Sequence, residues 1–330
     1  PGMEIRLSDN NGKEIRFLKE AEVDIENHKK NDFELTIKLD DWKGDIDYGY
    51  YIYIPETELG GIVSKIKSST KEQNIFVYGS TFRGLLAKKI IEPKKGEDYR
   101  VVNGELNEVL RELVEECTLS SLFSVPTVDT EVSVNFQFDR YCTLLDGMEK
   151  MLNSVGYRLD IRYIKNNVEA YVRLQAVPQV DYSGRKEFSQ DGGLSFVATN
   201  DQGGVNHLIC LGKGDLKDRI VKHLYVQKNG SIGEQPYYIG IEEIAETYDY
   251  SSAEEPELTK KGTERLKERM NSKKFEVDIE DEIEIDMQIG DIVGGRDYIT
   301  GIHVKKPIVG KIYTCKNGIE KTEYKIEGDD

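Results

Sequence analysis

The first ninety residues alternate between apolar and polar positions, which is the period of a half-buried strand. In FELTIKLD the apolar residues face one way and the polar residues the other: Phe33, Leu35, Ile37 and Leu39 against Glu34, Thr36, Lys38 and Asp40. More strands are expected at YYIYI (50–54), GIVSKIKS (61–68) and NIFVYG (74–79), because Gly, Pro, Asn and charged turns separate them. Residues 1–92 therefore predict a small antiparallel barrel or sandwich.

The period changes at about residue 93. The segment NGELNEVLRELVEECT spaces its apolar residues at helical intervals, with Asn103 as the expected cap. A second amphipathic helix is expected over about 139–155, where Gly156 supplies the stop. The segment YRLDIRYIKNNVEAYVRL then alternates on both sides of a turn at Asn166 and Asn167. Residues 93–188 thus predict an α/β unit of two helices and a hairpin.

Strand patterns return in residues 189–330, at GLSFVAT, at VNHLICLG and in ITGIHVKKPIVGKIYTCKNGIEKTEYKI. An excursion over about 213–275 interrupts them and includes a charged helix near 257–272. We expect this helix on the surface, because its apolar contacts are limited to Leu258, Leu266 and Met270. The predicted order is β unit, α/β insert, β unit.

Composition and charge narrow the classes of function. The chain is 32% charged, yet 19 Tyr and 10 Phe are spread among many β-branched residues, as in strand-rich globular proteins. Its 45 basic and 61 acidic residues give a net charge of −16, which disfavours a primary grip on DNA or on anionic lipid. No apolar run reaches the length of a membrane span, and the start, PGMEIRLSD, lacks the apolar core of a signal peptide.

The stretch IFVYGSTFRGLLAKKIIEP resembles a nucleotide-binding loop in one respect only. Gly79 and Gly84 have the glycine spacing of a Walker-type loop, in which backbone N–H groups cradle phosphates. Leu85 and Leu86 stand where that loop needs its Lys and its hydroxyl, and the first lysines, at 88 and 89, come a turn later. We therefore expect no nucleotide site, and another reason for this strand, turn and short helix.

Side chains that could hold a metal or act as nucleophiles are scattered. His207 and Cys210 are three apart in an expected strand, which sends them to opposite faces. The other histidines stand singly, no GxSxG elbow occurs, and the four cysteines contain no CxxC pair; these residues are His28, His223, His303, Cys117, Cys142, Cys210 and Cys315. We predict no catalytic residue, no metal and no cofactor.

Two acidic segments have alternative explanations. DDWKGDIDYG carries Asp40, Asp41, Asp45 and Asp47 but lacks the register of a calcium loop, so an acidic solvent turn is the simpler interpretation. In the expected strand 277–287, VDIEDEIEIDM, five acids share one face: Asp278, Glu280, Glu282, Glu284 and Asp286. A solvated outer face explains this pattern most simply. The alternative is a pore wall that lets DNA pass without sticking, because it offers no counterion-releasing contact.

Several stretches together resemble a known family. FVYGSTFRGLLAKKIIEP, GGLSFVATNDQGGVNHLICLGKGDLKDR, IAETYDYSSAEEPEL and IGDIVGGRDYITGIHVKKPIVGKI are similar, in that order, to segments of siphovirus tail-hub and tail-tip structural proteins encoded by phages and prophages of Gram-positive bacteria. Those proteins are similar in turn to the baseplate hub of contractile-tailed phages. The resemblance spans nearly the whole chain, and its motifs are glycine-punctuated β turns.

The resemblance implies a β-rich α+β fold with two small antiparallel β-barrels, at 1–92 and 189–330, and the α/β insert 93–188 between them. Three chains would form a ring that joins the tail tube to the tip and forms part of the DNA exit channel. Gly79 and Gly84 would then permit close packing of a barrel-closing strand and helix. In IGDIVGGRD a tight barrel turn is expected, in which Gly290, Gly294 and Gly295 relieve the backbone and Asp291 bonds locally.

The same resemblance implies partners and a location. A homotrimer would contact the distal tail protein, the tail tube, the tape measure and a tip or fibre, within a virion tail assembled in the bacterial host cytoplasm. Some relatives continue into a cell-wall hydrolase or fibre domain, whereas this sequence ends at KIEGDD after the last expected strand, so no enzymatic activity is expected.

Two other functions stay open at this point. A peptidoglycan peptidase or glycosidase would need acids held across a cleft, and carboxylates are abundant enough to permit this. A receptor-binding module would stack exposed Tyr on sugar rings, although most of the 19 Tyr should serve strand packing.

Overall fold

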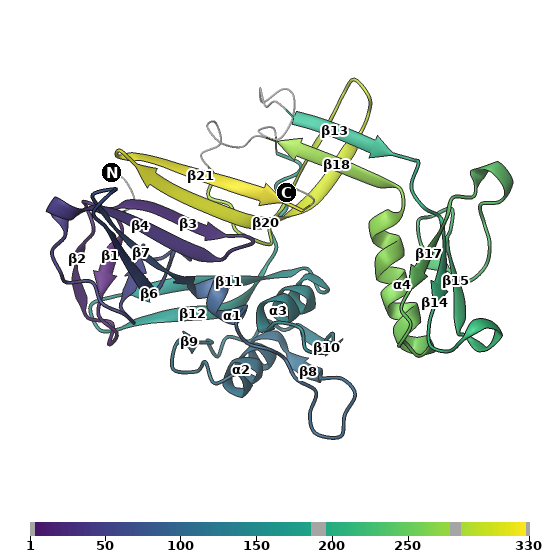
Figure 1. The fold of residues 1–330 in the computed structure, drawn as a ribbon, viewed down its shortest axis with the longest axis horizontal. Coiled ribbons are helices and arrows are strands. Elements are labelled where there is room, and N and C mark those ends of the chain that lie inside the picture. Colours follow the sequence, from purple (N-terminus) through teal and green to yellow (C-terminus); the bar gives the residue numbers. More distant parts are fainter. Residues whose placement is uncertain (1–3, 186–195, 278–284, 328–330) are drawn as a thin grey trace. The chain divides into compact units, whose positions relative to one another are not determined.

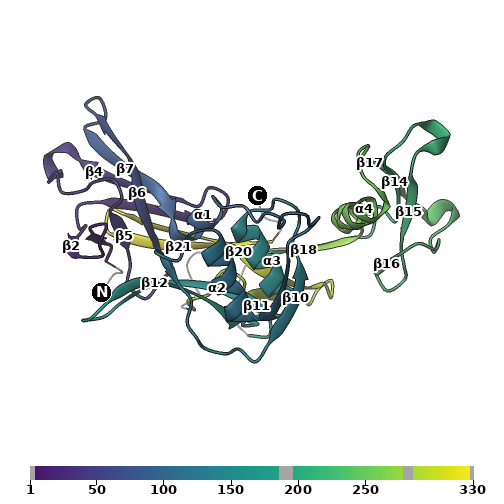
Figure 2. The ribbon, with the colours of Figure 1, turned by 90° about the horizontal axis from the view of Figure 1, so that it is seen from below.

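A computed structural model describes residues 4–185, 196–277 and 285–327 (Figure 1). These residues form two compact units. Unit 1 lies within Pro1–Leu194, Asp278–Gly294 and Lys305–Asp330, and unit 2 lies within Ser195–Val277 and Gly295–Val304. Figure 2 shows the same two units from a second direction, unit 2 mostly in green. None of the helices in these described ranges is long and apolar enough to cross a membrane.

Unit 1 is built on a ten-stranded sheet. Its paired strands follow one another in this order: β19 (Ile292–Arg296), β20 (His303–Lys316), β3 (Glu22–Asn27), β4 (Asp32–Lys38), β7 (Asn74–Thr81), β6 (Gly60–Ser69), β5 (Tyr51–Tyr53), β1 (Arg6–Ser8) and β2 (Glu14–Phe17), with β21 (Ile319–Ile326) paired to β20. The predicted alternation is confirmed in β4, where Phe33, Leu35 and Ile37 are buried on one face. A short 3-10 turn, Leu39–Asp41, follows β4.

Strands from distant parts of the chain share this sheet. Ile25 of β3 lies opposite Tyr313 of β20, and Val23 lies opposite Cys315. Strand β20, yellow in Figure 1, and strand β3, purple, are therefore hydrogen-bonded neighbours. The fold is β-rich with few helices, as expected. No strand pairing among the described residues closes the sheet into a ring, so the two-barrel arrangement is not confirmed. The domain boundaries 1–92, 93–188 and 189–330 likewise stay a prediction.

The expected insert forms a second layer of unit 1. The hairpin of β11 (Tyr157–Lys165) and β12 (Ala170–Pro178) takes β9 (Phe123–Ser124) as a third strand, and β8 (Val101–Glu105) pairs with β10 (Ser133–Gln137). Helices α2 (Leu106–Glu116) and α3 (Leu144–Asn153) pack on β12 and β11 (Figures 1 and 2). The cap of α2 is Glu105 and not Asn103, because the Glu105 carboxylate accepts hydrogen bonds from the N–H groups of Asn107 and Glu108.

Unit 2 contains two separate sheets. Strands β13 (Phe196–Asp201) and β18 (Ser272–Val277) form an antiparallel ribbon. The other sheet has the order β16 (Ile232–Gly233), β15 (Val221–Val226), β14 (His207–Leu211) and β17 (Ala245–Asp249), with 3-10 turns at Leu216–Asp218 and Gly240–Glu242. Helix α4 (Glu255–Arg269) is polar on its outer side and buries Leu258 and Leu266 against this sheet. The surface helix predicted near 257–272 is thus present and covers one sheet face.

Candidate functional site

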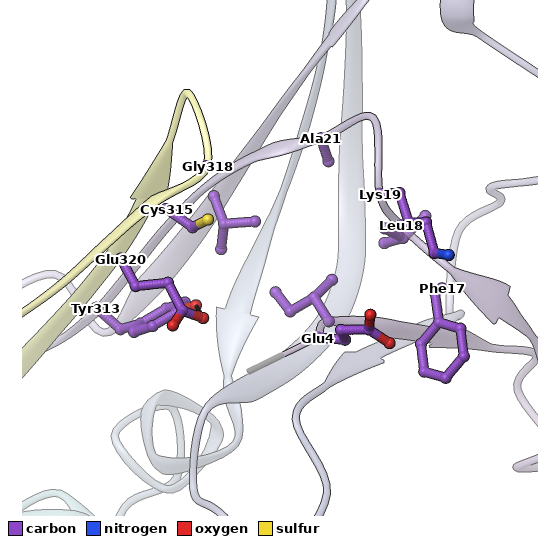
Figure 3. A pocket seen from close by; sticks show the side chains of 11 residues that line it. Glu4, Phe17, Leu18, Lys19, Ala21, Tyr313, Cys315, Gly318 and Glu320 are labelled. Atoms are coloured by element: carbon purple, nitrogen blue, oxygen red, sulfur yellow. Dashed lines mark hydrogen bonds between the residues drawn. The ribbon is translucent and has the colours of Figure 1, made fainter. Parts of the chain in front are cut away.

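A pocket of about 260 Å³ lies between β2, which is one end of the strand path, and strands β3, β20 and β21. Figure 3 shows Phe17 and Lys19, from β2 and the turn that follows it, across from Tyr313 and Cys315 of β20. The apolar side chains beneath belong to one core that all the central strands of the sheet share. The sheet therefore wraps around its core, and the pocket lies where the end strand β2 faces the interior strands β3 and β20 without pairing to them.

The side chains in this pocket do not form an acid–base pair of the catalytic kind. The hydroxyl of Tyr313 donates to Oε1 of Glu320 at 2.8 Å, and burial together with this carboxylate raises the pKa of Tyr313. Burial, with Glu320 nearby, also raises the pKa of the Cys315 thiol. A thiol whose pKa is raised is a poor nucleophile at neutral pH. The geometry favours a structural role for these side chains.

A buried arginine joins the sheet of unit 1 to the insert. The short helix α1 (Phe82–Leu86) is capped by Thr81, and it places Arg83 in the interior with only 3% of its surface exposed. The guanidinium donates to Glu58 at 3.0 Å, to Glu149 at 3.3 Å and to the carbonyl oxygen of Leu159 at 2.9 Å. Burial alone would lower the pKa of Arg83, but the two carboxylates outweigh it, so Arg83 stays charged.

The two glycines of this segment serve close packing, as predicted. A Cβ at Gly79 would collide with the carbonyl oxygen of Ile62, and one at Gly84 would collide with that of Asn31. The N–H of Gly84 already donates to Oγ1 of Thr81 at 3.0 Å. The backbone here is therefore occupied by internal contacts, in place of a phosphate cradle.

A second ionic cluster lies at the turn predicted for IGDIVGGRD. Asp291 is 1% exposed; its carboxylate accepts from the N–H groups of Gln288 and Val180 and lies 3.2 Å from Nε of Arg158. Gly290 takes a φ of +99°, which favours glycine. The predictions for Gly290 and Asp291 are confirmed, whereas Gly294 and Gly295 lie within strand β19 and not in the turn. Nη1 of Arg158 also donates to Asp160 at 2.9 Å, and this arginine lines a cavity of about 160 Å³.

The acidic segments are only partly described. Asp45 accepts a hydrogen bond from Nε of Arg16 at 2.7 Å, so this member of the aspartate-rich turn is committed to an ion pair. Residues 278–284 of the acidic strand predicted at 277–287 lie outside the described residues. At its end Asp286 is exposed and contacts Lys311 at 2.8 Å, whereas Met287 is buried; residues 285–288 form no strand, so the predicted strand does not extend to 287.

Two histidines of unit 2 come together, which the sequence did not reveal. Nε2 of His207 lies 2.8 Å from Nδ1 of His223, and Nδ1 of His207 lies 3.3 Å from Glu243. Only the pairing of β14 with β15 brings these positions into contact. Cys210 points to the opposite face, against Gly262 of α4, as predicted. Within the described residues, no group of His, Cys, Asp and Glu has an arrangement that could hold a metal.

Comparisons with known proteins give a likeness in structure only. No family model and no curated protein matches the chain. The alignment with a tail protein from Neisseria meningitidis MC58 covers 100% of this chain and 97% of the Neisseria protein, at 12% identity and a TM-score of 0.51. The alignment with the prophage tail protein gp18 from Listeria monocytogenes EGD-e covers 99% of this chain and 95% of gp18, at 13% identity and a TM-score of 0.51. The 43 kDa tail protein of prophage MuSo2 from Shewanella oneidensis aligns with 98% of each chain, at 12% identity and 0.52.

The chain has the fold of prophage tail proteins. The likeness covers both units, so the resemblance noted in the sequence is confirmed at the level of the fold. Tail proteins of several bacterial genera share this fold, and a Gram-positive host stays a prediction.

Proposed function

We propose that the protein is a non-enzymatic structural subunit of a phage or prophage tail. The observation that carries this proposal is the end-to-end alignment with three tail proteins, which leaves almost no part of either chain unmatched. The buried charges agree with it. Arg83 and Arg158 are each paired with a buried carboxylate of another segment, so loss of either arginine would leave a buried charge without compensation.

Within the tail, the proposed place is the hub or tip of a siphovirus-like particle. Three copies would form a ring between the tail tube and the tip, with the distal tail protein and tape measure as neighbours, and DNA would leave through its channel. The net charge of −16 supports a channel that does not retain DNA. The ten-stranded sheet of unit 1, whose central strands share one apolar core, is compatible with the expected barrel.

Purified tail particles from the strain that carries the gene provide the test. Quantitative mass spectrometry should find the chain in the particle at three copies, and antibody labelling should locate it at the tip. Absence of the chain from tail particles would refute the proposal. Release of fragments from purified cell walls by the isolated protein would instead support an enzyme.

A further inference from the structure

A loop of unit 2 presents an unusual density of apolar side chains to solvent. Residues 237–244 connect β16 to β17, and four of their large apolar side chains are exposed: Tyr237 by 45%, Ile239 by 68%, Ile241 by 101% and Ile244 by 39%. Single exposed apolar residues are common on protein surfaces, but a contiguous group of them marks an interaction site. We refer to residues 237–244 as the apolar loop.

The apolar loop is hydrogen-bonded to the residues where β14 begins. Asn206 clamps it from both sides, since its Nδ2 donates to the carbonyl oxygen of Glu242 at 2.8 Å and its Oδ1 accepts from the N–H of Ile244 at 2.9 Å. The backbone N–H groups of Asn206 and His207 both donate to the carbonyl oxygen of Ile244. A loop fixed before binding loses little conformational entropy in a complex.

A hollow of about 320 Å³ lies directly beside the loop. Tyr238, Ile241 and Ile244 of the loop line it together with Val226 and Met270. The same surface therefore offers a projecting side chain, Ile241, and a recess that could receive a side chain in return. Interlocking of this kind is typical of the central anchors of protein interfaces.

Charge defines the chemistry of the partner. Residues 229–259 contain no Lys, Arg or His but eight acids: Glu234, Glu242, Glu243, Glu246, Asp249, Glu254, Glu255 and Glu257. Several of them pair with cations of unit 2, such as Lys222 and Arg219. Glu242, at the centre of the loop, has no cation within 4 Å among the residues that the structure describes. Such a surface repels anionic lipid and nucleic acid and favours a basic partner.

We propose that the apolar loop is a docking site for a different tail protein, whose surface carries an apolar recess edged by Lys or Arg. Ile241 would enter that recess, and Glu242 and Glu243 would face the cations. This inference rests on the proposed function, because it assumes that the binding partner is another protein of the same tail. A membrane, a glycan and a second copy of this chain are the other outcomes of the test.

The test places a photo-crosslinking amino acid at position 241 of the chain in assembled tail particles. The matched control carries it at position 216, because Leu216 is 94% exposed in another loop of unit 2. We expect position 241 to crosslink to another tail protein at a site flanked by Lys or Arg, in at least tenfold higher yield than position 216. Crosslinking to a second copy of the chain, to lipid or to nothing would overturn the inference.

Substitutions separate docking from folding. Ile241→Asp should lower incorporation of the chain into tails about tenfold without changing its thermal unfolding, since the side chain is fully exposed; Leu216→Asp should change neither. Asn206→Ala leaves every exposed side chain in place and should lower incorporation by a smaller factor, through loss of the clamp. Normal incorporation of Ile241→Asp would contradict the inference alone, whereas a wild-type chain that is missing from tails would refute the proposed function and this inference with it.

Discussion

Replacing Arg83 with methionine removes the guanidinium that holds Glu58, Glu149 and the carbonyl group of Leu159 together inside unit 1. The carboxylate of Glu58 is only 4% exposed, and its Oε1 already has no hydrogen-bond partner, so loss of Arg83 leaves a buried charge without compensation. Breaking a buried ion pair from one side costs about 3–5 kcal/mol. Glu149 contributes less, because its side chain is 39% exposed and can be hydrated.

Urea unfolding followed by tryptophan fluorescence measures this cost. Trp42 is the only tryptophan of the chain and packs against the core of unit 1, so its signal reports on that unit. In thermal unfolding followed by the same fluorescence, each kcal/mol lost lowers the midpoint by about 2–4 °C for a unit of this size, so Arg83→Met should lower it by roughly 6–20 °C. The control is Lys150→Met, which breaks the exposed pair with Asp139 and should cost at most about 1 kcal/mol.

A double substitution tests the physical reason. Arg83→Met combined with Glu58→Leu removes both buried charges and should recover about 1–3 kcal/mol relative to the sum of the single changes. Strict additivity, or a loss below about 1 kcal/mol for Arg83→Met alone, would refute the argument that Glu58 depends on Arg83.

Three further outcomes are expected. Gly79→Ala should lower the free energy of unfolding of unit 1, measured in urea, by about 1–3 kcal/mol or more, because the new Cβ would meet the carbonyl oxygen of Ile62. The control Gly184→Ala should be nearly neutral, because the space around Gly184 is open. Burial favours the neutral form of Asp160, but the guanidinium of Arg158 outweighs burial and lowers the pKa of Asp160 below 3.8. The ionised carboxylate therefore stabilises the fold fully above pH 3.8, and this stabilisation is lost as the pH falls through the folded pKa. Asp160→Asn should flatten the acid limb of the curve of unfolding free energy against pH. The protein should not shift duplex DNA in a gel at physiological salt, and tight, salt-sensitive binding would contradict the proposed channel.

Local patterns identified most of the elements, because periodicity records which side of a strand or helix is buried. The alternation in β4, the stripe of α2 and the hairpin of β11 and β12 all followed from that signal. The pairing of β3 with β20 did not, since nothing in the alternation of either strand specifies its neighbour.

The site residues were harder to predict for the same reason. Arg83 stands in FRGLL like an ordinary exposed arginine, and its acceptors Glu58 and Leu159 lie 25 and 76 positions away. The contact between His207 and His223 depends on the register of β14 and β15. Local signals were carried by the spacing of Gly79 and Gly84, which close packing explains, and by the turn at Gly290 and Asp291.

The pairing of β3 with β20 has a consequence for synthesis on the ribosome. About 275 residues separate these strands, so the core of unit 1 stays open on one side until nearly the whole chain has emerged. Most of unit 2, at 195–277, emerges earlier and can fold while β3 still waits for its neighbour. The nascent protein thus carries an unsatisfied strand edge for most of its translation, and it should depend on chaperones to avoid aggregation.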